Sequence, residues 1–300
     1  MTSRTKAELL LVSITLIWGS TFVITKEILR SLPPFLYTAL RFLLATLIFG
    51  LWHLKSIRSM NRSSFLKGAG LGLLLFIGFS LQTVGLQYTT ASKSAFITGL
   101  LVILTPMCQI LIERRAPKIG NVIGVILVAV GLYLLTSPRG SEMNVGDLMT
   151  IGCALCFALY IVYLDVFSND SDPVQLTVAQ FLVSAIGGIV GSLLLEPFPS
   201  VFPIQALVGL LYLTIFATVI ALYVQVKYQR ESTPTRAAVI FALEPVVAAI
   251  AAYLVLGEII GTAGVIGGGI IVAGLLVSEL SDFLFSGSKT NGGSILQKDA

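Results

Sequence analysis

The sequence predicts an all-α membrane protein in which ten transmembrane helices form two inverted five-helix repeats. Hydrophobic residues make up 56% of the chain and charged residues 11%, and the mean hydropathy is +0.94. Soluble proteins carry about 25% charged residues, so this composition indicates a polytopic membrane protein with its core in lipid. Two further observations support the prediction: the apolar residues gather into ten runs, and the second half of the chain repeats the first.

Each of the ten runs is close to the length of about 20 residues that a helix needs to cross a bilayer. The runs cover residues 7–25, 34–54, 66–88, 94–112, 117–137, 145–164, 174–195, 204–226, 236–256 and 261–279. We expect residues 1–6 to form a short cytoplasmic lead, 7–137 a first repeat, 138–144 a linker and 145–279 a second repeat. Residues 280–300 are polar and rich in Gly and Ser, which predicts a disordered tail.

The distribution of Lys and Arg predicts the orientation of the chain in the membrane. If the N-terminus is cytoplasmic, most of the 19 Lys and Arg residues fall in inside loops and tails. The outside loops then hold only Lys26, Arg30, Lys93 and Arg139, and Arg41 lies within a span. Such a bias is a strong positive-inside signal. We therefore expect a multi-pass protein of the cell inner (plasma) membrane with both termini in the cytoplasm.

The internal repeat is visible when the chain is compared with itself at an offset of 139 residues. Matching positions are Glu8 and Asp147, Pro34 and Pro173, Pro106 and Pro245, and Arg41-Phe42-Leu43 with Gln180-Phe181-Leu182. After the fourth span the offset becomes 143, where Gly124 matches Gly267 and Gly131 matches Gly274. We expect the four-residue shift to lie near Glu113.

An odd number of spans in each repeat predicts that the second copy enters the membrane upside down relative to the first. The loop charges agree, because the loops after the second and fourth spans are basic and their repeat mates contain no Lys or Arg. Inverted repeats with a site near the midplane are the architecture of many secondary transporters. The sequence therefore favours a site between the two repeats.

The ninth run contains one carboxylate, Glu244, followed directly by Pro245. At ~1.5 Å per residue, Glu244 lies about 12 Å from Arg236, near the middle of the hydrocarbon. Pro245 has no N–H for the carbonyl of Phe241, and a free carbonyl at that depth is tolerated only beside protein or a wet cavity. We expect this helix to face a cavity, with Pro245 and its repeat mate Pro106 as hinges.

Arg41 is a second charge within a span, about 10 Å below the outer surface and therefore about 8 Å from Glu244 in depth. Either the two side chains pair when the site is empty, or they bind opposite ends of a zwitterion. The alternative for Arg41 is to extend outward to the headgroups. Glu244 is also the candidate site for proton coupling, because ionisable residues inside the membrane mark functional sites; its alternative is a structural acid satisfied by backbone and water.

Five further polar or aromatic side chains within spans complete the candidate substrate site: Trp18, Thr21, Gln82, Tyr160 and Gln180. Trp18 and Thr21 are three residues apart, so one face of the first helix presents both. For Gln82 and Tyr160, simple hydrogen bonding between helices is an equal alternative.

Other chemistry is not indicated. Cys108, Cys153 and Cys156 all lie in apolar runs, where Cys153-x-x-Cys156 reads more simply as two small residues one turn apart than as a metal site. Without a phosphate loop, zinc spacing or Ser-His-Asp set, we expect no cofactor, no metal, no nucleic acid and no ATP-driven transport. Gly120-x-x-x-Gly124 and Gly264-x-x-x-Gly268 predict close helix packing, within one chain or across a homodimer seam.

Several short motifs stand at corresponding places of the spans. They are Trp18-Gly19-Ser20-Thr21-Phe22 with Lys26, Arg41-Phe42-Leu43, Gly85-Leu86-Gln87-Tyr88, Glu244-Pro245 and Leu256-Gly257-Glu258. With the repeat, these motifs make residues 7–279 resemble the drug/metabolite transporter superfamily in its ten-helix EamA-type form. The first repeat departs from the pattern, because it has Glu113-Arg114-Arg115 where the second has Gly-Glu.

The resemblance implies that the first four helices of each repeat surround a central cavity, lined by Trp18, Thr21 and Gln180, and that the fifth and tenth lie to the side. We expect a secondary transporter, an exporter by family analogy, of small polar metabolites such as amino acids or their derivatives. It would work by alternating access in the lipid bilayer, with proton coupling left open. The alternative is a membrane-embedded enzyme or a channel, but Glu244 is the only deep acid and the spans are too apolar for a continuous polar stripe.

Overall fold

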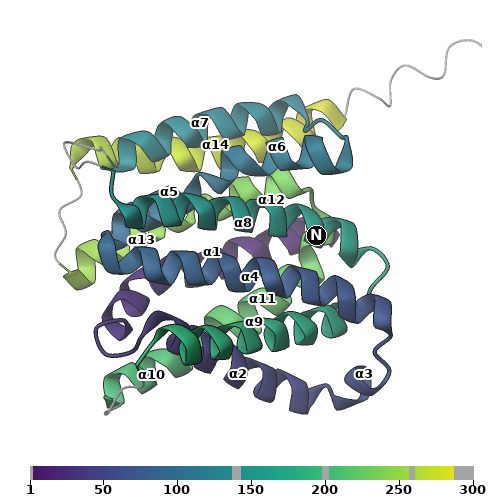
Figure 1. Ribbon diagram of the computed structural model, residues 1–300. Helices are drawn as coiled ribbons and strands as arrows, with labels where there is room; N and C mark the ends of the chain where they lie inside the picture. Colours follow the sequence, from purple (N-terminus) through teal and green to yellow (C-terminus); the bar gives the residue numbers. More distant parts are fainter. Residues whose placement is uncertain (1–2, 137–142, 198–202, 257–260, 287–300) are drawn as a thin grey trace, which may run out of the picture.

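The computed structural model describes residues 3–136, 143–197, 203–256 and 261–286, and within these ranges every regular element is a helix. Figure 1 shows the helices side by side in one bundle. In chain order they are α1 (Ser3–Ile28), α2 (Pro34–Trp52), α3 (Leu54–Arg58), α4 (Arg62–Tyr88), α5 (Ala91–Gly99), α6 (Leu101–Glu113), α7 (Ile119–Thr136), α8 (Val145–Ser168), α9 (Pro173–Leu195), α10 (Ile204–Tyr212), the π-helix η1 (Leu213–Ile220), α11 (Ala221–Tyr228), the short 3₁₀-helix η2 (Gln229–Glu231), α12 (Pro234–Phe241), α13 (Glu244–Leu256) and α14 (Thr262–Ser286).

Eight helical segments of the described chain are long and apolar enough to cross a membrane. They are Ser3–Ile28, Pro34–Trp52, Arg62–Tyr88, Ala91–Glu113, Val145–Ser168, Pro173–Leu195, Ile204–Glu231 and Pro234–Val255. Two shorter apolar helices, Ile119–Leu135 and Thr262–Ser278, coincide with the fifth and tenth apolar runs. The protein is therefore a multi-pass membrane protein.

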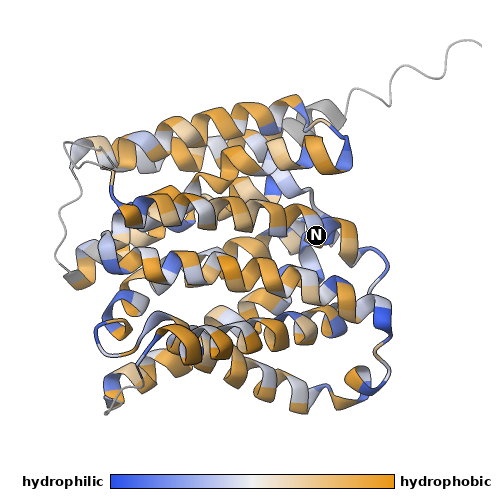
Figure 2. Ribbon diagram, viewed as in Figure 1, coloured by the Kyte–Doolittle hydropathy of each residue, from blue (hydrophilic) through white to orange (hydrophobic). Residues whose placement is uncertain are grey.

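The bundle places apolar side chains on its outer surface and many small polar side chains inside it. Leu111 and Leu193 are each 78% exposed, whereas Thr15 and Ser184 are fully buried. Apolar residues cover most of the ribbon in Figure 2. Lipid tails are as apolar as leucine, so helices in a membrane associate through close packing and interhelical hydrogen bonds rather than through apolar burial.

Helices α7 and α14 pack against each other along one side of the bundle, at the top of Figure 1. Glycines allow this close approach: a Cβ on Gly131 would lie 2.7 Å from the carbonyl oxygen of Gly267, and one on Gly124 would lie 2.9 Å from that of Gly274. The two helices that carry the predicted motifs thus pack within one chain, but through different glycines. Among the described contacts, only Gly124 of the predicted glycines makes a close contact at this seam, which is otherwise formed by Gly131, Gly267 and Gly274, and a Cβ on Gly268 would lie 3.7 Å from Val246.

Two spans are interrupted halfway, and the interruptions correspond at an offset of 143. The side chains of Thr90 and Thr233 accept a backbone N–H and cap α5 and α12. The breaks follow at Leu100, between α5 and α6, and at 242–243, between α12 and α13. The caps and breaks thus correspond at 143 from Thr90 onward, whereas the sequence led us to expect that offset only beyond Glu113.

The π-helix η1 explains part of the shift. It lies in the eighth span, and each π turn takes more residues than an α turn because its hydrogen bonds join residues five apart. The matching helix α4 is α-helical throughout. The prolines therefore occupy different positions: Pro245 is the second residue of α13, directly after the break, whereas Pro106 lies inside α6, beyond the break at Leu100.

Candidate functional site

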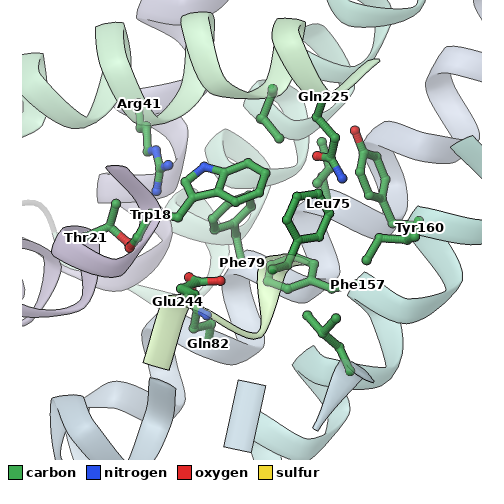
Figure 3. Close-up of a pocket in the computed structure, with 14 residues that line it drawn as sticks. Trp18, Thr21, Arg41, Leu75, Phe79, Gln82, Phe157, Tyr160, Gln225 and Glu244 are labelled. Carbon is green, nitrogen blue, oxygen red and sulfur yellow. The ribbon is translucent and has the colours of Figure 1, made fainter. Parts of the chain in front are cut away.

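A cavity lies among the helices near the interruption between α12 and α13 (Figure 3). Its walls are contributed by α1, α2, α4, α6, α8, α11, α12 and α13. The lining side chains are Trp18, Thr21, Arg41, Leu75, Phe79, Gln82, Leu101, Phe157, Tyr160, Ile161, Leu222, Gln225, Phe241 and Glu244. Six of the seven side chains that the sequence nominated thus lie around one cavity; the seventh, Gln180, lies behind it.

Glu244 enters the cavity because the chain breaks directly before it. Helix α12 ends at Phe241, and Glu244 is the first residue of α13. Pro245 fits the first turn of α13, because backbone N–H groups there have no partner within the helix. Figure 3 shows the carboxylate turned into the cavity, and no hydrogen bond or ion pair reaches it from the described part of the chain.

Arg41 projects inward from α2 and is only 3% exposed. Its Nε donates to the hydroxyl of Thr218 at 2.6 Å, and its Nη1 donates to the hydroxyl of Tyr37 at 3.0 Å. The guanidinium carbon lies 4.7 Å from the centre of the Phe79 ring, within the range of a cation–π contact. Arg41 therefore neither extends to the surface nor pairs with Glu244 in this structure, and Nη2 makes no hydrogen bond to the described residues.

Trp18 and Thr21 come from the same face of α1, as their spacing predicts. The indole N–H of Trp18 donates to the carbonyl of Ala217 at 2.9 Å, and its ring meets Phe241 edge-on at 5.3 Å between centroids. The hydroxyl of Thr21 donates to the carbonyl of Trp18 at 2.8 Å. Both groups thus use their hydrogens within the protein.

The remaining nominated residues lie in hydrogen bonds between helices. Gln82 donates through Nε2 to the hydroxyl of Thr98 at 3.2 Å. Tyr160 donates to Oε1 of Gln180 at 2.8 Å. Gln180 is fully buried, and its Nε2 has no hydrogen-bond partner among the described residues. Gln82 and Tyr160 each line the cavity and also form a hydrogen bond between helices, so the two expected alternatives occur together.

A model of the EamA-like transporter family matches residues 5–137 and 144–280. The chain belongs to this family. An uncharacterized transporter of Archaeoglobus fulgidus is 33% identical over 281 residues, 92% of this chain and 87% of that protein. The threonine/homoserine exporter RhtA of Escherichia coli K12 is 26% identical over 259 residues, 81% of each protein. A crystal structure with 19% sequence identity has the same fold, with a TM-score of 0.77 over 94% of this chain and 99% of that one.

Family and relatives identify this EamA-like protein as a transporter and not an enzyme. The resemblance to the drug/metabolite transporter superfamily is therefore confirmed. Within the described ranges, no three His, Cys, Asp or Glu side chains converge as metal ligands would. Glu258 and the neighbouring Gly257 lie outside the described residues.

Sequence reasoning missed two polar groups of this EamA-like site, Gln225 and Thr218. Gln225 lines the cavity, and Thr218 holds Arg41 from the π-helix η1. A signal was available for Gln225, which is a polar amide inside the largely apolar run 204–226. The π geometry itself gave no signal, although π segments frequently occur at functional sites.

Two buried ion pairs lie toward opposite ends of this transporter. At one end, Arg236 of α12 binds Glu8 of α1, with Nε 2.6 Å from Oε1. At the other, Lys93 of α5 binds Asp147 of α8, with Nζ 2.6 Å from Oδ2, and the hydroxyl of Thr89 donates to Asp147 at 2.9 Å. The amine of Lys26, near the end of α1, donates to the carbonyl of Thr89.

Glu8 and Lys26 lie on one helix, so the two charge clusters are about 27 Å apart at ~1.5 Å per residue. This distance approaches the thickness of the bilayer core. The cavity lies between the two ends, because Trp18 and Thr21 fall between Glu8 and Lys26 along α1.

Proposed function

We propose that this transporter carries small zwitterionic amino acids or their derivatives across the cell inner membrane, as an exporter that works by alternating access. The observation that carries the proposal is the state of the two cavity charges. Arg41 and Glu244 line one cavity yet make no ion pair with each other. An unpaired charge in a membrane interior is costly, so both groups are suited to binding a ligand that supplies the missing partners.

The two charges differ in what they can bind. Arg41 keeps N–H groups beyond those given to Thr218 and Tyr37, and a guanidinium suits a carboxylate because it can donate two parallel bonds. The Glu244 carboxylate accepts the N–H groups of an ammonium. A zwitterion therefore neutralises both at once, whereas a simple cation or anion leaves one charge unpaired.

The rest of the cavity suits an organic body of moderate polarity. Phe79, Phe157 and Phe241 contribute rings, and Leu75 and Leu222 contribute aliphatic surface. Small-molecule sites commonly combine such apolar walls with a few placed polar groups that fix orientation. The name of the relative RhtA, a threonine/homoserine exporter, supports an amino-acid substrate and the direction of transport.

Alternating access would use two inverted repeats of five helices. The repeat mates Glu8 and Asp147 pair with Arg236 and Lys93, which correspond at an offset of 143. The glycine seam crosses over in the same way, because Gly124 meets the mate of Gly131 and Gly131 meets the mate of Gly124. Reciprocal contacts of this kind are the signature of a two-fold axis.

Each ion pair joins the two repeats, α1 with α12 and α8 with α5. Rocking of one repeat against the other would therefore open one end by separating one pair while the other pair holds the opposite end closed. The positive-inside bias supports a cytoplasmic position for both termini, and with them for the Glu8–Arg236 end. Glu244 is the residue suited to proton coupling, since among the described residues it is the only acid that lines the cavity.

The test is counterflow in proteoliposomes loaded with unlabelled amino acids, quaternary amines or sugar phosphates against labelled tracers. We expect saturable exchange for amino acids, and loss of it in Glu244→Gln and Arg41→Gln. Asp170→Asn is the matched control, because it neutralises an acid whose side chain is 74% exposed and does not line the cavity. Exchange of quaternary amines alone would overturn the zwitterion proposal, and unchanged pH-gradient dependence of residual flux in Glu244→Gln would exclude this residue as the coupling site.

A further inference from the structure

We propose that Gln225 recognises a hydrogen-bond donor on the substrate's side chain, and that Gln229 sets which end of the Gln225 amide faces the cavity. The inference rests on the proposed transport of amino acids and narrows the substrate class to those whose side chains carry an O–H or N–H group. Gln225 lines the cavity from α11, whereas Gln229, one turn later in η2, is not among the lining residues.

Two consecutive hydrogen bonds, here called the ladder, link Gln225 at the cavity to Gln229 and then to the backbone of Ile161. Nε2 of Gln225 donates to Oε1 of Gln229 at 2.9 Å, and Nε2 of Gln229 donates to the backbone carbonyl of Ile161 at 2.7 Å. Both glutamines are buried, with 2% and 0% of their surface exposed. The ladder joins the eighth span to α8, across the back of the cavity.

The direction of donation along the ladder is set by the backbone carbonyl of Ile161 at its inner end. A carbonyl can only accept, so Gln229 must turn its NH₂ group toward Ile161 and its oxygen toward Gln225. That oxygen can also only accept, so Gln225 must turn its NH₂ group toward Gln229. The amide oxygen of Gln225 is then the end left for a ligand, and Figure 3 shows this amide at the cavity.

Two hydroxyl groups at the cavity also present acceptors to a ligand. Thr21 and Tyr160 each have one O–H hydrogen, and each donates it to an acceptor within the protein, so their oxygens keep only lone pairs for a ligand. Gln82 gives one of its two amide hydrogens to Thr98 and keeps the other. With the Glu244 carboxylate and the Gln225 oxygen, the cavity therefore holds several acceptors, and Arg41 is its charged donor.

The positions of these groups divide their roles. In Figure 3, Gln225 and Tyr160 lie on one side of the cavity and Arg41 and Thr21 on the other, with the indole of Trp18 between them. A substrate whose carboxylate binds Arg41 and whose ammonium binds Glu244 directs its side chain toward Gln225. A donor at the end of that side chain meets an acceptor, and an apolar end leaves the buried oxygen of Gln225 unpaired.

Sites built to hydrogen-bond a substrate group discriminate strongly against the analogue that lacks it, because their own buried polar atoms then lose a partner. The experiment compares counterflow of two pairs that differ by one hydroxyl: homoserine with 2-aminobutyrate, and tyrosine with phenylalanine. We expect wild type to favour the hydroxyl-bearing member of at least one pair by about tenfold in kcat/KM.

Two variants separate recognition of the substrate by Gln225 from orientation of the Gln225 amide by Gln229. Gln225→Met removes the acceptor and should bring the ratio close to one. Gln229→Met leaves the cavity lining intact but frees the Gln225 amide to turn, and it should also lower the ratio. Gln109→Met is the matched control, since Gln109 is a buried glutamine that bonds Glu113 and Thr235 away from the cavity, and we expect it to keep the wild-type ratio.

Equal transport of both members of each pair by wild type would overturn the inference while leaving the proposed function intact. A Gln229→Met ratio equal to that of wild type would overturn the orienting ladder. Exchange of no amino acid at all would overturn the proposed function and this inference together. If Gln229→Met does not fold, the wild-type and Gln225→Met ratios still decide whether the side-chain donor is recognised.

Discussion

Glu8 and Arg236 lie 228 positions apart in the chain, and their side chains form a buried two-point ion pair. Nε of Arg236 is 2.6 Å from Oε1 of Glu8, and Nη2 is 3.2 Å from Oε2. Arg4, one turn before Glu8, also binds Oε1 at 2.9 Å. The pair joins the start of the first span to the start of the ninth, so it ties α1 to α12 at this end.

We predict that Glu8→Gln destabilises the protein by about 3–5 kcal/mol, because breaking a buried pair leaves its partner charge uncompensated. The measurement is thermal unfolding of the purified protein in detergent. The double variant Glu8→Arg with Arg236→Glu should recover part of the loss by restoring the pair in reverse. Equal melting of Glu8→Gln and wild type would show that the pair contributes nothing.

We predict that Asp147→Asn favours opening at the other end of the cavity. Asparagine nearly preserves the size of the side chain but removes the charge that holds Lys93 at 2.6 Å. The measurement is labelling of Gln82→Cys by an impermeant thiol reagent, in a background where Cys108, Cys153 and Cys156 are replaced by Ala.

The reagent is applied to one face of oriented vesicles at a time. Labelling should accelerate from the Lys93 face in Asp147→Asn and from the opposite face in Glu8→Gln. Acceleration from the same face in both variants would contradict the assignment of the two pairs to separate ends.

We predict that Arg41→Lys impairs transport almost as much as Arg41→Gln. Lysine keeps the positive charge but lacks the planar fork that holds Thr218 and Tyr37 and stacks on Phe79. The expected effect is a rise of about tenfold or more in KM, measured by counterflow. Wild-type KM in Arg41→Lys would show that charge alone is sufficient.

We predict that Gly131→Ala destabilises the protein by about 1–3 kcal/mol through overpacking. Its new Cβ would lie 2.7 Å from the carbonyl oxygen of Gly267 and 2.9 Å from the backbone nitrogen of Ile271, and neither atom can move without shifting a helix. Gly70→Ala is the control, because a Cβ there has no neighbour within 4 Å and alanine favours the helix. Thermal unfolding of the two variants should therefore change in opposite directions.

The sequence was informative wherever the membrane limits what a residue can do. An acid and a proline in the middle of an apolar run are costly in lipid, so Glu244 and Pro245 could be expected to face an interior before any coordinates, whereas Arg41 could equally have extended to the headgroups. The structure brings all three to one region of the bundle. The partners of Arg41 were not predictable, because Thr218 and Tyr37 are ordinary residues in pattern and become ligands only through packing.

The sequence predicted a repeat from its prolines and glycines, but the caps and breaks of the helices correspond at a different offset from the prolines. Identity of residue type aligned Pro106 with Pro245, whereas the caps and breaks relate Thr90 to Thr233 and Leu100 to Leu243. A sequence comparison cannot see where a π-helix takes up additional residues, since i→i+5 hydrogen bonding is decided by packing of the surrounding helices.

By itself, the sequence determined the membrane class, the family and the residues too polar to face lipid, because transfer into hydrocarbon penalises charge regardless of the fold. The tertiary structure alone decided which of these residues pair and which do not. Glu8 finds Arg236 and Lys93 finds Asp147, whereas Arg41 and Glu244 line one cavity without an ion pair between them. The physical reason is that hydrogen bonds and ion pairs require contact within about 3–4 Å, and only the packing of helices from both halves brings such atoms together.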